Sequence, residues 1–472
     1  MNPGAVEVCD DGIDQDCDPD PSACRATGSN SLATHDARLT GFIALGYVSE
    51  GHDVGDVTGD GVRDLLVLCP NPWGYLPVVP AARLMPGPVS GDASLSTAWT
   101  TFTDASTDLG SSGAGEIDFD RDGNNDVLLG TEYVDDDSGS SDTVYGFRGP
   151  VSAGTTSASS ADLTITALGS IGSFGTSFAR ADTDGDGFED LVLGAGLLGS
   201  GGYPGGAYLF TGALSGAMTS LDATGTVLSD ADDAAGRVVA SPGDVDGDGL
   251  DDLLLGAPRQ NSSSTYPGPG QAYLFLSPVS GTMLTSDADA TFVGETDEDE
   301  AGFGLSGAGD QDGDGLPDLL VGAPYYGGLG QYYGSAYLIP GATRGTLSLA
   351  DAGTIFRGDA RYDEVGWSLA DGDADGDGQA DLGVGAYDHT TTRTSDGVVY
   401  LFYGPVASGT LSTSLSADAS FHGEMESDRA GYGVSFGDLD EDGLSDLIIA
   451  ALFGNEEVAY GGAVYVVRGH GE

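Results

Sequence analysis

A nine-residue acidic pattern, D-x-D-x-D-G-x-x-D, occurs seven times in this chain of 472 residues, with Thr58 in place of the second aspartate in the first copy. Its regular spacing constrains the fold more than any other feature. The copies start at residues 56, 118, 182, 244, 310, 373 and 438, so successive starts lie 62, 64, 62, 66, 63 and 65 residues apart. A fixed period of this kind indicates a repeat architecture in which each copy marks one supersecondary unit.

Four short apolar segments accompany each acidic copy. One precedes it, as in GFGLSGAG at 302–309, and one follows it directly, as in LLLGAP at 253–258. Two more come later in the unit, as in QAYLFLS at 271–277 and ATFVG at 290–294. Four strands per unit predict one antiparallel blade, and seven units predict an all-β, seven-bladed β-propeller of four-stranded antiparallel blades. A linear solenoid is the alternative architecture.

The two ends of the chain predict how the ring closes. The last unit stops after AVYVVRG at 463–469 and lacks its outer strand, whereas ARLTGF at 37–42 resembles such a strand. An N-terminal strand that completes the seventh blade would leave no open sheet edge. We therefore expect a propeller over residues 37–470, preceded by a poorly ordered Cys/Asp-rich segment over residues 1–36.

The acidic side chains of each copy need a positive partner. The four aspartates of the copy at 244–252 form six repelling pairs, which at about 4 Å would cost on the order of 6–24 kcal/mol. Ca²⁺ takes six to eight oxygen ligands, often from alternating residues of a tight loop. A glycine at position 6, which all seven copies have, permits the sharp turn that such a loop requires.

We therefore predict up to seven calcium sites, each formed by the side chains at positions 1, 3, 5 and 9 and the carbonyl at position 7. The predicted ligands are Asp56, Thr58, Asp60, Val62 and Asp64; Asp118, Asp120, Asp122, Asn124 and Asp126; Asp182, Asp184, Asp186, Phe188 and Asp190; Asp244, Asp246, Asp248, Leu250 and Asp252; Asp310, Asp312, Asp314, Leu316 and Asp318; Asp373, Asp375, Asp377, Gln379 and Asp381; and Asp438, Asp440, Asp442, Leu444 and Asp446. Thr58 makes the first site the weakest.

Two other interpretations of the acidic copies fit the sequence less well. A helix–loop–helix calcium loop needs a glutamate at position 12, where this chain has residues such as Leu255 in an apolar strand. Solvated Asp-Gly turns would explain a single copy, but not seven copies in register. Calcium loops of extracellular modules bind at about 10⁻⁴–10⁻³ M, a range that suits an ion outside cells.

The charge balance restricts the possible partners. The formal net charge is −60, and all 15 basic residues are arginine, which argues against nucleic acid and anionic membrane as partners. A coding bias or a salt-adapted surface would scatter the acids, whereas in this chain they are clustered. No run of 18 apolar residues predicts a membrane span, and no signal peptide is visible. We expect either a cytosolic protein or part of a larger secreted precursor, and the calcium loops favour the secreted form.

The N-terminal segment has its own motif. EVCDDGIDQDCDPD at 7–20 resembles the short Cys/Asp-rich metal-binding motif of secreted bacterial multi-module proteins. Its aspartates could bind a cation, with Cys9 paired to Cys17 or Cys24, or the segment could be an acidic linker with one disulfide. Cys69 stands alone in an apolar setting and is expected to be a core thiol.

The strand motifs resemble the FG-GAP repeats of integrin alpha subunits and of bacterial secreted and surface proteins. The resemblance rests on GAP at 256–258 and 322–324, and on FG-like pairs such as Phe174-Gly175, Phe303-Gly304 and Tyr432-Gly433. It covers about residues 37–470 and implies a seven-bladed propeller with calcium on its lower face. GAP is replaced by LCP, GTE, GAG, GAY and AAL in the other units, which weakens the match of blades 1, 2 and 7. No stalk or inserted domain is visible, so only the scaffold carries over.

Function is less constrained than fold. Aromatic residues gather in the hairpin loops opposite the acidic copies, where they could bind a partner or cap their own blades. They are Trp73, Tyr75, Tyr133, Tyr203, Tyr266, Tyr325, Tyr326, Tyr332, Tyr333 and Tyr387. G-x-S-x-G at 433–437 and G-x-G-x-x-G at 302–307 lack the helix that each motif requires.

We expect a monomeric, extracellular, calcium-binding propeller that acts as a binding or adhesion module and is not an enzyme. Its partner would be a protein or a carbohydrate on the face opposite the calcium loops, without membrane insertion. The alternatives are a polysaccharide-cleaving propeller enzyme, since 75 acidic residues would hide a catalytic pair, and a purely structural surface repeat protein.

Overall fold

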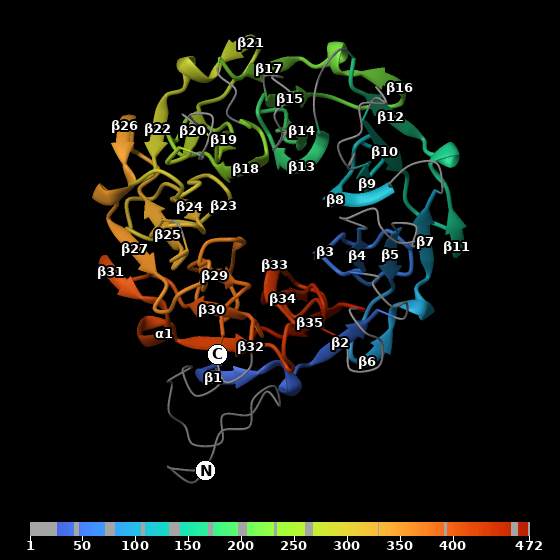
Figure 1. Ribbon diagram of the computed structural model, residues 1–472. Coiled ribbons are helices and arrows are strands. Elements are labelled where there is room, and N and C mark those ends of the chain that lie inside the picture. The colour runs from blue at the N-terminus through green and yellow to red at the C-terminus, as the bar shows by residue number, and fades with distance from the viewer. Residues whose placement is uncertain are drawn as a thin grey trace, which may run out of the picture.

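Seven β-sheets stand around a central axis in the computed structural model, and each sheet forms one blade of a ring (Figure 1). The structure describes residues 26–41, 47–70, 81–104, 109–131, 142–168, 173–196, 205–230, 234–259, 268–328, 330–390, 394–454 and 461–470. Within these residues nearly all regular structure is strand, which confirms the all-β, seven-bladed propeller. The predicted metal motif at 7–20 and the cysteines at 9, 17 and 24 lie outside the described residues.

Each blade has four antiparallel strands, which are arranged in chain order from the central axis to the rim. Blades 1 to 7 follow one another in chain order around the ring. The innermost strands are β3 (Glu50–Asp53), β8 (Leu109–Ile117), β13 (Phe174–Ala181), β18 (Val238–Gly243), β23 (Leu305–Gly307), β28 (Leu369–Gly372) and β33 (Ala430–Gly437). The second strands are β4 (Leu65–Cys69), β9 (Asp126–Thr131), β14 (Asp190–Ala195), β19 (Asp252–Ala257), β24 (Leu319–Ala323), β29 (Asp381–Ala386) and β34 (Asp446–Ala451). The third strands are β5 (Ala81–Met85), β10 (Thr143–Phe147), β15 (Gly206–Phe210), β20 (Gln271–Phe275), β25 (Ser335–Ile339), β30 (Val398–Phe402) and β35 (Ala463–Val467). The fourth strands are β7 (Thr100–Thr103), β12 (Leu163–Thr166), β17 (Gly225–Leu228), β22 (Ala290–Val293), β27 (Thr354–Arg357), β32 (Ala419–His422) and β2 (Ala37–Thr40).

A fifth strand, supplied by the following repeat unit, extends every blade at its rim. These strands are β11 (Gly154–Thr156), β16 (Gly216–Thr219), β21 (Gly281–Leu284), β26 (Gly345–Ser348), β31 (Gly409–Ser412), β1 (Gly28–Ser31) and β6 (Gly91–Ser94). Each pairs parallel with the fourth strand of its blade, as Thr226 of β17 faces Thr282 of β21. The fifth strand covers an edge that would otherwise be open, and it links each unit to its neighbour.

One short helical turn connects each fifth strand to the fourth strand of the next blade. These turns are η2 (Leu32–Thr34), η3 (Leu95–Thr97), η4 (Ala158–Ser160), η5 (Ser220–Asp222), η6 (Thr285–Asp287), η7 (Leu349–Asp351) and α1 (Thr413–Ser416). No helix in the described part of the chain is both long and apolar enough to cross a membrane.

The ring closes through the N-terminal strand, as predicted. β2 pairs antiparallel with β35, so that Leu39 faces Val464, and it completes blade 7. The preceding strand β1 pairs with β32 of blade 6, where Asn30 faces Phe421. The N-terminal residues therefore contribute to two C-terminal blades (Figure 1).

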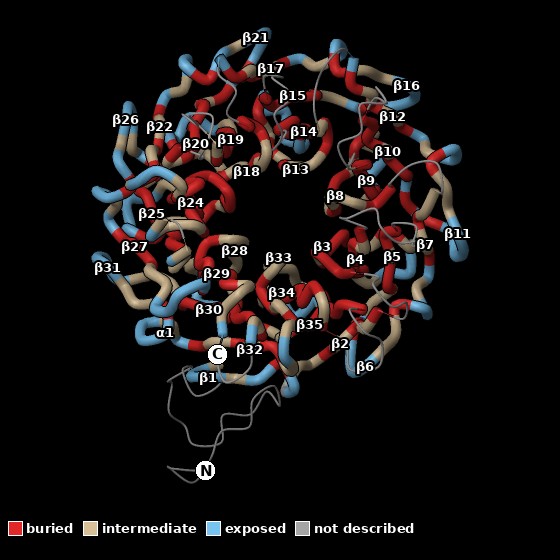
Figure 2. Tube along the Cα trace, in the orientation of Figure 1, coloured by how far each residue is buried: buried red, intermediate tan, exposed pale blue. Residues whose placement is uncertain are grey.

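The hydrophobic core lies between neighbouring blades. The second strand of each blade is largely buried, whereas the fifth strands are exposed at the rim (Figure 2). One cluster joins Leu254 and Phe292 of blade 4 to Leu319 and Tyr337 of blade 5. The thiol of Cys69, at the end of β4, is partly buried against a similar cluster of blades 7 and 1.

Glycine at the start of the GAP motif allows the blades to approach closely. A Cβ atom on Gly256 of blade 4 would lie 2.0 Å from the carbonyl oxygen of Gly302 in blade 5. A Cβ on Gly322 would lie 2.0 Å from the carbonyl oxygen of Gly366 in blade 6. Because no side chain fits at such distances, the glycine of the GAP motif is required for neighbouring blades to pack this closely.

Candidate cation-binding loops

The seven acidic copies form the loops that connect the innermost strand of each blade to its second strand. We call them loops 1 to 7, with positions 1 to 9, so that loop 4 covers residues 244–252 between β18 and β19. Because every blade has the same strand order, all seven loops lie on one face of the ring.

The aspartate at position 1 organises the turn. In loop 4 the carboxylate of Asp244 accepts hydrogen bonds from the backbone N–H groups of Gly247 at 2.7 Å, Asp248 at 3.0 Å and Gly249 at 2.7 Å. The bond from the position 6 glycine recurs in all seven loops. The φ angle of this glycine lies between +83° and +92° in every loop, so the sharp turn predicted at position 6 is present.

The aspartate at position 9 joins the loop to the rest of its blade. Asp252 begins β19 and is only 1% exposed. Its Oδ2 accepts from the N–H of Val245 at 2.9 Å, and its Oδ1 accepts from the N–H of Ser277, beyond β20, at 2.8 Å. The same pair of bonds is present in each of the other six loops.

Burial shifts the titration of these position 9 carboxyls. It raises the pKa of Asp252 to about 6, and that of Asp126, Asp381 and Asp446 to about 7. Nearby loop aspartates add a like-charge contribution in the same direction, whereas the backbone N–H donors oppose it. A cation beside such a group would favour its charged form.

Carboxylate oxygens converge in at least five of the loops. Three oxygen atoms lie within 4.8 Å of one another in each of the sets Asp118–Asp120–Asp122, Asp182–Asp184–Asp186, Asp244–Asp246–Asp248, Asp310–Asp312–Asp318 and Asp373–Asp375–Asp381. An all-oxygen donor set of this kind fits a hard divalent cation such as Ca²⁺ or Mg²⁺.

The remaining predicted ligands occupy the same turn. In loop 1, Asp56 accepts from the N–H of Gly61 at 2.8 Å, and in loop 7, Asp438 accepts from Gly443 at 3.0 Å. The residue at position 7 donates its N–H to the position 5 aspartate in every loop. The role of the position 7 carbonyls, and of each loop residue as a ligand, stays a prediction.

Sequence reasoning missed three arginines that form ion pairs with predicted ligands of the loops. Arg121 of loop 2 contacts Asp186 and Asp190 of loop 3, Arg148 pairs with Asp120, and Arg468 pairs with Asp440. The available signal was that position 4 is glycine in five loops but Arg121 in loop 2 and Glu441 in loop 7. That signal identifies an unusual residue without revealing which carboxylate it reaches.

Aromatic side chains form a connected network on the opposite face, over blades 5 to 7. Trp367 lies at the centre, with ring centroids 4.4 Å from Phe303, 4.2 Å from Tyr387 and 5.5 Å from Tyr432. Tyr325 contacts Phe303 at 6.1 Å. Apart from the buried Phe303, these rings are partly exposed.

The network includes some of the predicted rim residues and extends beyond them. Tyr332 continues it from Tyr325 at 5.2 Å, and Arg357 lies over the ring of Tyr326. Phe303, Trp367 and Tyr432 were not predicted as rim residues, although their recurrence at the FG position was visible. Trp73, Tyr75, Tyr133, Tyr203 and Tyr266 lie outside the described residues.

Comparisons with known proteins identify the repeat. Residues 235–275, 301–339 and 430–467 match the FG-GAP repeat. These segments span the loop and the three inner strands of blades 4, 5 and 7, so blade 7 matches although AAL replaces its GAP.

The similar proteins include integrin alpha chains and phosphatidylinositol-glycan-specific phospholipases D. Integrin alpha-PS2 of Drosophila melanogaster is 33% identical over 186 residues, which are 37% of this chain and 13% of that protein. Phosphatidylinositol-glycan-specific phospholipase D of Rattus norvegicus is 36% identical over 212 residues, or 42% of this chain and 24% of that protein. Integrin alpha pat-2 of Caenorhabditis briggsae is 31% identical over 230 residues, or 45% and 18%. The matches thus span a quarter or less of each relative.

These comparisons correct the expectation that the chain is not an enzyme. That expectation rested on the lack of a convincing catalytic motif, yet the similar proteins include phospholipases D from rat, mouse, cow and human at 31–39% identity. A repeat scaffold occurs in enzymes as well as in integrin alpha chains, because function belongs to sites placed on a fold. The repeat motif therefore does not exclude catalysis.

Proposed function

We propose that this seven-bladed propeller with FG-GAP repeats is a calcium-stabilised, extracellular binding module whose aromatic face engages a protein or glycan partner. The observation that carries the proposal is the shared geometry of the loops. In all seven loops the position 1 aspartate accepts a hydrogen bond from the position 6 glycine, and the position 9 aspartate accepts two from backbone N–H groups. In at least five loops, three carboxylate oxygens lie within 4.8 Å of one another.

The energetics favour a cation in these loops. The loop carboxylates repel one another, and burial disfavours the charged form of the aspartate at position 9. A bound Ca²⁺ supplies the positive charge that offsets both effects. In loop 4 it would be held by Asp244, Asp246, Asp248 and Asp252, together with the carbonyl of Leu250.

The affinity expected of such loops supports the extracellular assignment. Calcium loops of extracellular modules have dissociation constants of about 10⁻⁴–10⁻³ M, so calcium fills them outside cells and leaves them largely empty in the cytosol. Loop 1 is expected to bind least tightly because Thr58 replaces one carboxylate with a hydroxyl.

The aromatic network is the proposed partner surface. Tyr325, Trp367, Tyr387 and Tyr432 present partly exposed rings within one continuous cluster. Aromatic rings give a large contact area at little cost in side-chain entropy, and they stack on sugars as well as on protein side chains. The similarity to phospholipases D favours a second candidate, in which the same surface presents substrate as the binding module of an enzyme.

A thermal melt tests the metal assignment. The protein is stripped with chelator and then titrated with calcium and, separately, with magnesium. A ligand that binds only the folded state stabilises it by about 2.7 kcal/mol per site at one hundred times its dissociation constant. We expect a calcium-specific rise in the melting temperature that is half complete near millimolar calcium.

A matched pair of double variants makes the test specific to the loops. D246N with D248N removes two predicted ligands of loop 4, whereas D297N with D351N removes two exposed acids outside the loops. The first pair should reduce the calcium-dependent rise and the second should preserve it. No response to calcium, or equal behaviour of the two pairs, would refute the metal assignment.

A further inference from the structure

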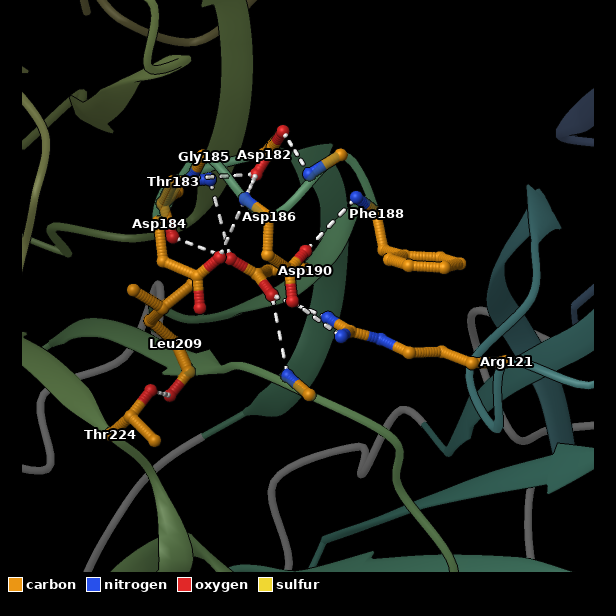
Figure 3. A network of polar contacts seen from close by, with 12 residues as sticks. Arg121, Asp182, Thr183, Asp184, Gly185, Asp186, Phe188, Asp190, Leu209 and Thr224 are labelled. Carbon is orange, nitrogen blue, oxygen red and sulfur yellow. Dashed lines mark hydrogen bonds and ion pairs between the residues drawn. The ribbon is translucent and has the colours of Figure 1, made fainter.

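An arginine from blade 2 reaches into the acidic loop of blade 3. The Nη1 atom of Arg121 lies 2.5 Å from Oδ2 of Asp186, and its Nη2 atom lies 3.6 Å from Oδ1 of Asp190 (Figure 3). The guanidinium carbon is 4.6 Å from the ring centroid of Phe188, at position 7 of the same loop. The side chain of Arg121 is 19% exposed and that of Asp190 is fully buried, so the contact is partly shielded from solvent.

Two further arginines make an equivalent contact within their own blades. Arg148 and Arg468 each follow the third strand of a blade, directly after β10 and β35. The Nε atom of Arg148 pairs with Oδ2 of Asp120, and the Nη1 atom of Arg468 lies 3.0 Å from Oδ2 of Asp440. Both partners are the aspartate at position 3, so loops 2, 3 and 7 each hold a guanidinium against a predicted ligand.

Loops 4 and 5 provide the contrast. Their predicted ligands form no ion pair with an arginine among the residues that the structure describes. Both loops nevertheless bring three carboxylate oxygens within 4.8 Å of one another, as loops 2 and 3 do. Arg344 donates to the backbone carbonyl of Val245 in loop 4 at 3.4 Å, but it pairs with none of the predicted ligands. The loops therefore share a turn and a set of carboxylates but differ in whether a guanidinium is paired with a predicted ligand.

We propose that Arg121, Arg148 and Arg468 are built-in cations that make the loops fill in a fixed order, with loops 4 and 5 taking calcium before loops 2, 3 and 7. The inference rests on the proposed function, because it concerns how these loops bind the same ion. A Ca²⁺ ion that enters loop 3 must displace the guanidinium from Asp186 or approach it against like-charge repulsion. In the absence of calcium, the same guanidinium offsets part of the carboxylate repulsion.

The consequence is a graded response to calcium. Loops 4 and 5 would order at low calcium, while loops 2, 3 and 7 would keep their shape through their arginines and bind calcium only at higher concentration. Blades 2, 3 and 7 would then depend less on calcium for stability than blades 4 and 5.

Hydrogen–deuterium exchange as a function of calcium tests the order, because mass spectrometry resolves each loop. In loop 3 the N–H groups of Asp186 and Gly187 donate to Asp182, and a bound ion should slow their exchange. We expect the wild-type protein to protect loop 4 at lower calcium than loop 3. R121G, which introduces the residue that five other loops have at this position, should lower the loop 3 midpoint by about tenfold and leave loop 4 unchanged.

Two more variants separate charge from backbone effects. R121Q removes the guanidinium without adding glycine, and it should shift loop 3 in the same direction. R361Q removes an equal charge on the opposite face, beside Tyr362, and should shift neither loop. For both R121 variants, the melting temperature in chelator should lie further below that of the calcium-loaded form than it does for the wild type.

The outcomes distinguish this inference from the proposal on which it rests. If loop 4 of the wild-type protein shows no response to calcium, the metal assignment fails and the filling order fails with it. If loop 4 responds but loop 3 has the same midpoint in wild type, R121G and R121Q, only the built-in cation is refuted. A shift in R121G without a shift in R121Q would also refute it, because the backbone would then be the cause.

Discussion

The aspartate at position 9 of each loop is a buried acid whose titration is linked to folding. Without metal, the pKa of Asp381 rises to about 7 in the folded protein from an ordinary value of 3.8. Between these values the folded state keeps a proton that the unfolded state has released. The contribution of this group to the free energy of unfolding therefore falls as pH rises from about 4 through 7.

A neutral substitution isolates this contribution. D381N has no carboxyl group to titrate, so in chelator wild type should lose stability relative to D381N as the pH is raised from 4 to 8. With calcium, the wild type should instead be more stable than D381N above neutral pH, because the ion stabilises the carboxylate of Asp381. Thermal melts across this pH range, with and without calcium, measure both effects. A wild-type profile in chelator that runs parallel to that of D381N would contradict the linkage.

At single positions the sequence predicts the local conformation and the type of ligand better than it predicts which side chains meet across blades. The spacing of the aspartates predicted the tight turn, and the position 6 glycines adopt the positive φ that it requires. The arginine contacts were not predictable, because Arg121 meets Asp186 across a separation of 65 residues. The register between neighbouring blades decides that pairing, and no local pattern encodes it.

Among the structural elements, the second strand of blade 4 contains a glycine with no room for a side chain. A methyl group on Gly256 of β19 would clash with the carbonyl oxygen of Gly302 in blade 5 and separate the two blades. Overpacking of this kind typically costs about 1–3 kcal/mol. We expect G256A to lower the free energy of unfolding in urea by at least about 1 kcal/mol. G353A, where a Cβ meets nothing within 4 Å, is the control and should be near neutral.

The strand pattern predicted the four antiparallel strands of each blade but not the fifth. Apolar segments identify strands that pair with their neighbours in the chain, as β19 pairs with β20. β21 has only four residues and is mostly exposed, so it carries no buried apolar run that would mark it as a strand. Its partner, β17, belongs to the preceding unit, and only the closed ring brings the two together.

For the whole molecule, the closure of the ring is the feature with the largest expected effect on stability. β2 is the fourth strand of blade 7, and it lies between β35 and β6. The side chain of Arg38 also pairs with Glu424 and Asp92, both at 2.9 Å, and so joins residues from the two ends of the chain. Closure therefore combines backbone pairing, apolar burial of Leu39 and a shared ion-pair network.

Deletion of residues 1–41 should break this closure, because it removes both β1 and β2. Blade 7 would keep three strands and expose the unpaired edge of β35, which invites edge-to-edge association. We expect a lower melting temperature and a concentration-dependent rise in apparent mass by light scattering. Deletion of residues 1–25 keeps both strands and is the matched control, which should melt as the full chain does. If the protein without residues 1–41 stays monomeric and has the same melting temperature as its control, the other six blades hold the ring closed without the N-terminal strands.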